Sequence, residues 1–401
     1  MSACLARSLA VAAVVFISAP SLRAETYTMV TTRGNPAGQL RVWEVTSSGD
    51  MTQVDLIAVP PVGSTARMEV DPFGRFLLSA GIDGTVTSFA VSPDGSLDLV
   101  ATYARPGWTL FSRTHTLSPD GRFYVVHTRN NSVTPREWHF EALAVESDLT
   151  LTELPWKFRQ DETDDTIAPN QFGICQLPSD SYGLLFTSWA GGLAHVAVMP
   201  MSASGEISSP EQWFDFNAQP IAGGFTTRVD QRIVVTGGAA PPQSLSFAIS
   251  ASGEAQLVDV WDTAVDGVWG ASGIRLLPSG DRMVTGIHIG TAPIEASGEF
   301  NGGVLRGPSG SLVDAHPGVS PDGRIAVTTW DVDGQGIHWG VFALTPGRGP
   351  VLLRDHVLPF GYADIAFIPP RTEEMLGDAN GDGLRDAADV VTYINHLADD
   401  P

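Results

Sequence analysis

Short apolar runs alternate with turn residues along most of the chain. Residues 66–104, ARMEVDPFGRFLLSAGIDGTVTSFAVSPDGSLDLVATYA, contain four such runs, separated by segments that carry Pro, Asp and Gly. Runs of β-branched, aromatic and aliphatic residues of this length are typical of strands, and these turn residues reverse the chain direction. The pattern therefore predicts one four-stranded antiparallel meander.

The same unit returns along the rest of the chain. Five further copies carry an apolar run, a turn and a second run, around residues 114–129, 173–190, 224–238, 273–290 and 316–330. The turns follow one another at intervals of about fifty residues, which is the period of β-propeller blades. The pattern indicates an all-β fold built from repeated four-stranded sheets.

The two ends of this array complement each other. Three strands, at 26–33, 39–45 and 51–59, precede the first full unit, and one spare strand, ADIAFIPP at 363–370, follows the last. Three strands and one complete a blade, so residues 25–370 are predicted to form a seven-bladed β-propeller closed by pairing of the last strand with the first. Closure removes the sheet edges that an open array exposes. A pair of β-sandwiches is the alternative, but it does not explain the matching deficit and surplus.

Three local features lead to further expectations. The acidic segment FRQDETDDTIAPNQ, residues 158–171, is expected to be a surface loop. Cys175 is expected to be a small buried residue, with a reactive thiol as the alternative. Tryptophan side chains along the repeats are expected in the propeller core, with sugar-stacking platforms as the alternative; they include Trp138, Trp156, Trp189, Trp213, Trp261 and Trp269.

The first 24 residues have the pattern of a secretory signal. Arg7 is followed by an apolar run from Leu9 to Ile17 and by the small residue Ala24. This order of charge, apolar run and small residue is that of a cleaved signal peptide. The run is too short to span a bilayer, and no later segment is long and apolar enough. The mature protein is therefore predicted to be exported, to the periplasm or the extracellular space, with no transmembrane segment.

The charge of the chain excludes some partners. The formal net charge is −22, and Lys157 is the only lysine. Nucleic acids and anionic membrane surfaces select for Lys and Arg, so neither is expected to bind. A strongly acidic chain instead favours divalent cations.

The repeat resembles a known family. The unit VDPFGRFLLSAGIDGTVTSFAVSPDGSLDLVATY is similar to a blade of the lactonase-like seven-bladed β-propellers, and the resemblance covers about residues 25–370. It implies a propeller fold and, more weakly, opening of a lactone ring. The family's histidine before the Asp-Gly turn corresponds to His115, which is close to Arg113. His115, Arg113 and Glu69 lie on predicted innermost strands and are the candidate catalytic residues of a site that needs a base, a cation for a developing oxyanion and an oriented water. A structural or merely solvated role is the alternative for each.

The segment DANGDGLRDAAD, residues 378–389, differs from everything before it. It fits the twelve-residue calcium loop, in which oxygen ligands stand at positions one, three, five, seven, nine and twelve and a glycine at six makes the sharp turn. The predicted ligands, in that order, are Asp378, Asn380, Asp382, the carbonyl of Leu384, Asp386 and Asp389, with Gly383 at six. Ca²⁺ is therefore the predicted cofactor. A solvated acidic turn is the alternative.

Asp389 at position twelve indicates which kind of calcium-binding module the segment resembles. Residues 371–401 resemble a single repeat of a type I dockerin, whose calcium loop ends in aspartate and is followed by one helix. Here that helix is expected to begin near Asp386 and to carry an apolar stripe of Val390, Ile394 and Leu397. The resemblance implies a cohesin-like or cell-surface partner for this segment.

Two classes of function follow from these observations. In the first, the protein is a non-catalytic secreted scaffold, whose propeller binds an unidentified ligand or protein and whose calcium-binding tail attaches it. In the second, it is a secreted hydrolase of a lactone or carbohydrate, tethered through the same tail. The first is favoured because a fold alone is a poor guide to chemistry.

Overall fold

The computed structural model describes most of residues 25–370. Gaps fall at several connections, among them 33–37, 60–64, 162–167, 217–224 and 263–273, while residues 1–24 and 371–401 lie outside the described residues. The described residues contain only strands, turns and short connections, so the all-β prediction is confirmed. None of them forms a helix long and apolar enough to cross a lipid bilayer.

The described strands form seven antiparallel sheets, each of which extends from an innermost to an outermost strand. In that order, the first sheet holds β29 (Asp364–Ile368), β1 (Thr26–Thr32), β2 (Gln39–Thr46) and β3 (Met51–Ala58). The second holds β4 (Thr65–Val70), β5 (Phe76–Gly81), β6 (Val86–Val91) and β7 (Leu97–Tyr103). The third holds β8 (Trp108–Leu117), β9 (Phe123–Asn130), β10 (Glu137–Val145) and β11 (Leu151–Asp161). The fourth holds β12 (Ala168–Gln176), β13 (Tyr182–Ala190), β14 (Leu193–Met201) and β15 (Gln212–Phe216).

The remaining three sheets complete the array. The fifth holds β16 (Phe225–Arg228), β17 (Ile233–Gly237), β18 (Gln243–Ile249) and β19 (Ala255–Asp262). The sixth holds β20 (Ile274–Leu276), β21 (Arg282–Thr285), β22 (Gly290–Pro293) and β23 (Leu305–Arg306). In the seventh, β24 (Ser311–Leu312) and β25 (Gly318–Val319) both pair with β26 (Ile325–Val332), which is followed by β27 (Gly336–Ala343) and β28 (Val351–Leu358).

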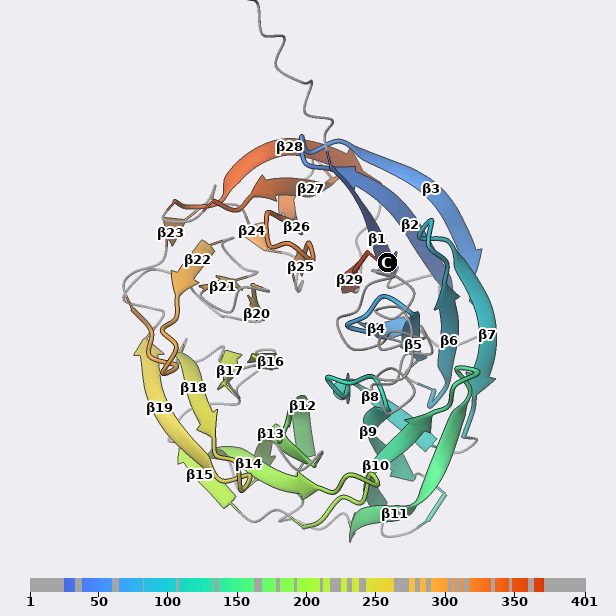
Figure 1. The fold of residues 1–401 in the computed structure, drawn as a ribbon, viewed down its shortest axis with the longest axis vertical. Coiled ribbons are helices and arrows are strands. Elements are labelled where there is room, and N and C mark those ends of the chain that lie inside the picture. The colour runs from blue at the N-terminus through green and yellow to red at the C-terminus, as the bar shows by residue number, and fades with distance from the viewer. Residues whose placement is uncertain are drawn as a thin grey trace, which may run out of the picture.

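The sheets stand around a common centre, as in a β-propeller (Figure 1). The predicted pairing of the two terminal strands is confirmed, because β29 pairs antiparallel with β1 from Thr28↔Ile368 to Thr32↔Asp364. The ring is therefore joined by strands from opposite ends of the chain.

Hydrophobic side chains fill the spaces between neighbouring sheets. Ile365 and Phe367 of β29 pack with Trp43 and Trp339 between the seventh and first sheets, whereas Ile368 packs with other apolar residues between the first and second. Successive side chains of a strand point to opposite faces, so one short strand contributes to two cores. Strand β29 therefore connects the packing on both sides of the closure.

Several local predictions can now be compared with the structure. Cys175 is fully buried, as expected, and its thiol is 3.6 Å from the carbonyl oxygen of Gly183. Trp138 is buried and Trp261 half-buried, but Trp156 is 49% exposed, so the core prediction is wrong for Trp156. The side chains of Trp189, Trp213 and Trp269 lie outside the described residues.

The surface loop predicted for residues 158–171 is largely wrong. Strand β11 continues to Asp161 and β12 begins at Ala168, so both ends of the acidic segment are strand residues. The end of β11 pairs with β10, where Gln160 faces Trp138 and Asp161 faces Glu137. An outermost strand leaves much of its surface in water, and charged residues there are compatible with strand structure.

A repeated turn links the third sheet to the fourth. Ser118 donates a hydrogen bond to Asp120 at 2.6 Å, and the backbone N–H of Phe123 donates to the Ser118 hydroxyl at 2.9 Å. Tyr182, at the start of β13, donates to the other oxygen of Asp120 at 2.5 Å, and Arg122 donates to that oxygen at 2.6 Å. One carboxylate thus holds its own turn and the neighbouring sheet.

The same arrangement recurs at the ring closure. In the seventh sheet Ser320 donates to Asp322 at 2.6 Å, and Tyr27 of β1 donates to the other oxygen of Asp322 at 2.6 Å. Arg324 pairs with Glu25. The sequence Ser-Pro-Asp-Gly-Arg therefore acts as a link between sheets as well as a turn.

Substitution Asp120→Asn should remove a contribution to the free energy of unfolding that depends on pH. Burial acts to raise the pKa of Asp120, but hydrogen bonds from Ser118, Tyr182 and Arg122 outweigh it, and the pKa is lowered. A carboxyl whose pKa is lower in the folded state contributes stability above its unfolded pKa of about 3.9, and loses it as pH falls through the folded pKa. In urea titrations, the wild type should exceed Asp120→Asn by about 1–2 kcal/mol above about pH 5. The difference should shrink toward about pH 2; a difference that stays constant with pH would contradict the assignment.

Outermost strands share an irregularity. The pairing between the third and fourth strands shifts register in five of the seven sheets, as far as the described residues extend. In the first sheet Val42 faces Asp55 and Trp43 faces Gln53, which leaves Val54 as an extra residue. In the second, Ser88 faces Ala101 and Phe89 faces Leu99, which leaves Val100. Such bulges interrupt an edge strand and discourage pairing with another sheet.

Candidate functional site

Neighbouring side chains of the innermost strands differ in exposure. In β4, Met68 is 1% exposed and packs in the core between the first and second sheets, whereas the next residue, Glu69, is only half-buried. In β29, Ile365 is buried and Ala366 is half-buried. Since neighbouring side chains of a strand point oppositely, Glu69 points away from the core that holds Met68, whereas Ala366 still packs against that core.

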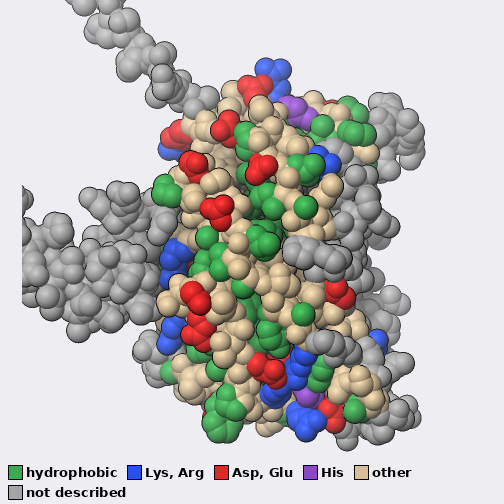
Figure 2. Space-filling view, turned by 90° about the vertical axis from the view of Figure 1, so that its right-hand side faces the viewer, with side chains coloured by type: hydrophobic (Ala, Val, Ile, Leu, Met, Phe, Trp, Pro, Cys, Tyr) green, Lys and Arg blue, Asp and Glu red, His purple; other side chains and the backbone are tan. Residues whose placement is uncertain are grey.

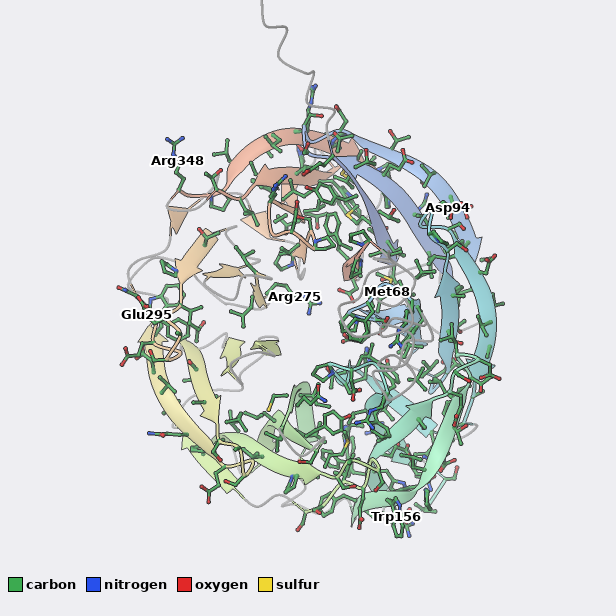
Figure 3. All side chains as sticks on the ribbon, viewed as in Figure 1. Met68, Asp94, Trp156, Arg275, Glu295 and Arg348 are labelled. Carbon is green, nitrogen blue, oxygen red and sulfur yellow. The ribbon has the colours of Figure 1, made fainter. Side chains whose placement is uncertain are left out.

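A cavity of about 240 Å³ lies among these strands. Four innermost strands, β4, β20, β25 and β29, contribute to its walls, so it belongs to the central channel. The residues that line it include Glu69, Arg275, Val319, Ser320, Ala366 and Pro369. Figure 3 shows Arg275 reaching from β20 toward the middle of the ring.

Glu69 and Arg275 give this cavity its chemistry. They come from the second and sixth sheets, which are separated by about 200 residues of sequence, yet they line the same space. A guanidinium offers several hydrogen-bond donors in one plane, which suits a carboxylate, phosphate or oxyanion. A carboxylate accepts hydrogen bonds from hydroxyl groups and can act as a base. The cavity therefore combines a hydrogen-bond-donating cation with a hydrogen-bond-accepting carboxylate.

Asp364 fixes the strand beside Glu69. Its side chain is 1% exposed, and one carboxylate oxygen accepts a hydrogen bond of 2.8 Å from the backbone N–H of Met68. The other oxygen accepts from the N–H of Ile365 at 3.0 Å. Because Met68 directly precedes Glu69, the last strand of the ring positions the part of β4 that carries the cavity's carboxylate.

The three residues predicted as catalytic do not all reach this cavity. Glu69 lines it, but the His115 side chain is fully buried, with its ring 5.4 Å from that of Tyr124. Counting back from the Pro of each turn, His115 stands where Met68 stands in β4, and both side chains are buried. Arg113 belongs to β8, and its side chain lies outside the described residues.

Arg275 was not among the predicted residues, although the repeat contained a signal for it. It stands three residues before Pro278, just as Glu69 stands three residues before Pro72. Alignment of the repeats on this proline would have grouped Glu69, Thr116 and Arg275, although Cys175, at the same position, is buried in a core. The prediction relied instead on the histidine of the resembling family, and that residue falls one position away.

A second group of charged residues lies in the third sheet. Glu141 is 1% exposed and accepts hydrogen bonds from Arg105 at 2.5 and 2.7 Å and from Thr128 at 2.9 Å. Lys157 lies 3.4 Å from the same carboxylate. The guanidinium of Arg105 also lies 3.6 Å from the ring centre of Trp108. These groups are already satisfied by one another, so we interpret the cluster as structural.

The predicted calcium ligands, from Asp378 to Asp389, lie outside the described residues. Within the part of the chain that is described, no group of three or more His, Cys, Asp or Glu side chains is arranged to hold a metal ion.

Comparisons with known proteins add evidence on the fold. No protein-family model matches the chain, and no curated protein does. A crystal structure of a protein from Lactobacillus plantarum is similar with a TM-score of 0.64 at 12% identity, covering 86% of this chain and 99% of that one. The "putative 6-phosphogluconolactonase" of Bacteroides fragilis is similar with a TM-score of 0.63 at 13% identity, covering 87% and 100%. At such identities the likeness shows the fold alone, which is that of a lactonase-like β-propeller.

Proposed function

We propose that this protein is an exported, closed seven-bladed β-propeller that binds a small anionic polyol, such as a sugar acid, in its central channel. The observation that carries the proposal is the presence of Glu69 and Arg275 in one cavity. Arg275 pairs with the ligand's carboxylate or phosphate, and Glu69 accepts hydrogen bonds from its hydroxyl groups. At about 240 Å³ the cavity is smaller than the sites of drug-sized ligands, which favours a ligand the size of a monosaccharide.

Substitution Arg275→Met should weaken the binding of gluconate at least about tenfold. A hydrogen bond to a charged group contributes about 1.5–3 kcal/mol, and about 1.4 kcal/mol corresponds to a factor of ten. Isothermal titration calorimetry measures the dissociation constant, with glucose as the uncharged comparison. Arg348→Met is the matched control, because Arg348 is exposed outside the ring (Figure 3). Equal weakening in both variants, or no heat with the wild type, would contradict a channel site.

A second candidate function is hydrolysis of a sugar lactone. The same two residues favour it: Glu69 would activate a water molecule and Arg275 would hold the developing oxyanion. The name of the Bacteroides fragilis neighbour suggests such a substrate. If binding alone is the function, glucono-δ-lactone should open no faster with protein than in buffer. A rate increase that Glu69→Gln abolishes would make the protein a hydrolase and the binding proposal incomplete.

We also propose that residues 371–401 bind one Ca²⁺ and serve as the attachment segment for a cohesin-like or cell-surface protein. The spacing of the oxygen ligands in DANGDGLRDAAD supports this. The signal-like residues 1–24 support export to a compartment where calcium is abundant.

Substitution Asp382→Ala should abolish calcium uptake by the full-length protein. It removes the ligand at position five of the loop, whereas Asp399→Ala, outside the loop, should leave affinity unchanged. Calorimetry with Ca²⁺ measures both. Because a ligand at about a hundred times its dissociation constant stabilises its site by about 2.7 kcal/mol, a chelator should increase protease cleavage after Pro370 and leave the β-sheet signal intact. If Asp382→Ala binds Ca²⁺ with wild-type affinity, residues 378–389 are a solvated acidic turn and not a calcium loop.

A further inference from the structure

The exposed hydrophobic side chains of this protein are concentrated on its outer wall. Nine large hydrophobic side chains of the described residues are exposed, and all but Val133 lie on outermost strands. They are Val54, Leu56, Leu99, Val100, Trp156, Val260, Val351 and Val357. Single exposed apolar residues are ordinary, but grouping on one part of a surface indicates contact with a partner.

Four of them, which we call the rim patch, lie on two successive outermost strands: Val54 and Leu56 on β3, and Leu99 and Val100 on β7. Their exposed fractions are between 41% and 51%. Strands β3 and β7 follow one another along the outer wall, and their sheets share one hydrophobic core (Figure 1). Figure 2 looks at this wall and shows hydrophobic side chains running down its middle with acidic ones beside them.

Two of the four residues are exposed because of the backbone. Val54 and Val100 are the extra residues of the bulges in β3 and β7, so neither directly faces a residue of the neighbouring strand. The same bulges interrupt the edge on which a foreign strand would pair. A partner is therefore expected to contact the rim patch through side chains rather than by adding a strand.

The charge beside the rim patch identifies the chemistry of that partner. Glu44, Asp55 and Asp98 are exposed on β2, β3 and β7, and none forms an ion pair within the described residues. Among those residues, the one cation facing the patch, Arg41 opposite Leu56, donates to Gln53. A second copy of the chain would bring the same negative charges, and residues 371–401 are themselves rich in aspartate. Lysine and arginine side chains would be complementary, which favours association and selects against acidic surfaces.

We propose that the rim patch is a docking surface for a protein segment that presents apolar side chains together with Lys or Arg. The apolar side chains cover Val54, Leu56, Leu99 and Val100, and the basic ones pair with Glu44, Asp55 and Asp98. The contact lies on the outer wall and is independent of the channel cavity, so both can be occupied together.

Binding of a short amphipathic peptide of leucine and lysine tests the proposal. Fluorescence anisotropy with the full-length protein should show binding that weakens as salt is raised, because exposed charges are screened. Leu99→Lys should weaken binding about tenfold or more, whereas Val260→Lys, the same charge change at an exposed site on β19, should not. The same peptide with glutamate in place of lysine should not bind.

Four results would overturn the proposal. The first two are that the glutamate peptide binds as well as the lysine peptide, and that Leu99→Lys and Val260→Lys lose affinity equally. The third is a dimer of the wild type in sedimentation that Leu99→Lys dissociates, which would make a second copy the occupant. The fourth is tighter peptide binding by a chain ending at residue 370 than by the full chain, which would make the tail the occupant.

Discussion

A chain that ends at residue 362 should fail to fold cooperatively, whereas a chain that ends at residue 370 should melt like the full-length protein. The two differ by β29, whose buried side chains include Ile365, Phe367 and Ile368. Losing a large buried side chain costs about 2–5 kcal/mol, so these three together cost roughly 6–15 kcal/mol. A folded domain is stable by only about 5–15 kcal/mol. The loss of one short strand is therefore comparable with the whole stability of the ring.

Other contacts of β29 increase this effect. Its removal also breaks the ladder with β1 and leaves the N–H of Met68 without the carboxylate of Asp364. Thermal melting followed by far-UV circular dichroism and by tryptophan fluorescence provides the measurement. If the chain ending at 362 keeps the melting temperature of the chain ending at 370, the last strand does not close the ring in the way the structure indicates.

Substitution Glu141→Ala should lower the free energy of unfolding by about 3–5 kcal/mol. Removing one member of a buried ion pair leaves the other charge without its partner in a place where water compensates poorly. Here the remaining group is Arg105, whose side chain is 17% exposed; it loses two hydrogen bonds to Glu141 and keeps the more exposed Glu153 as an anionic partner. Urea unfolding followed by fluorescence measures the change.

Glu153→Ala is the matched control for this substitution. Glu153 contacts the same two cations, Arg105 and Lys157, but its side chain is 39% exposed. An exposed ion pair contributes about 0–1 kcal/mol, so this variant should stay close to the wild type. Equal losses in the two variants would mean that burial of Glu141 does not determine the strength of the cluster.

The architecture could be predicted because local and global signals agree. Each turn with Pro, Asp and Gly fixes a chain reversal, and the apolar runs between turns have the length of a strand. The strand at 363–370 could be assigned to the first sheet because that sheet lacked one strand. Contacts between sheets could not be predicted in this way. The Ser-Pro-Asp-Gly-Arg turn predicts a chain reversal, but not the hydrogen bond that Tyr182 of the next sheet donates to Asp120.

The candidate site was harder to predict because it depends on the direction of single side chains. Moving one position along a strand turns the side chain to the other face of the sheet, and the buried His115 and half-buried Thr116 differ by that step. Arg275 and Glu69 meet only through the closure of the whole ring, which no local pattern encodes. Trp156 illustrates the same limit on the outer wall. Its strand, β11, is the outermost strand of the third sheet and pairs with β10 on one side, so its other edge faces water.

The pairing of β1 with β29 also determines when the protein can fold. The two strands stand at opposite ends of the described chain, so this contact spans most of the sequence. Chains grow at about 5–20 residues per second, and the first sheet remains three-stranded until residue 368 has been synthesised. Contacts between distant residues form slowly because the intervening chain must first be ordered. The nascent protein therefore carries incomplete sheets with open edges for much of its synthesis, and ring closure is expected to be the late, slow step of its refolding from denaturant.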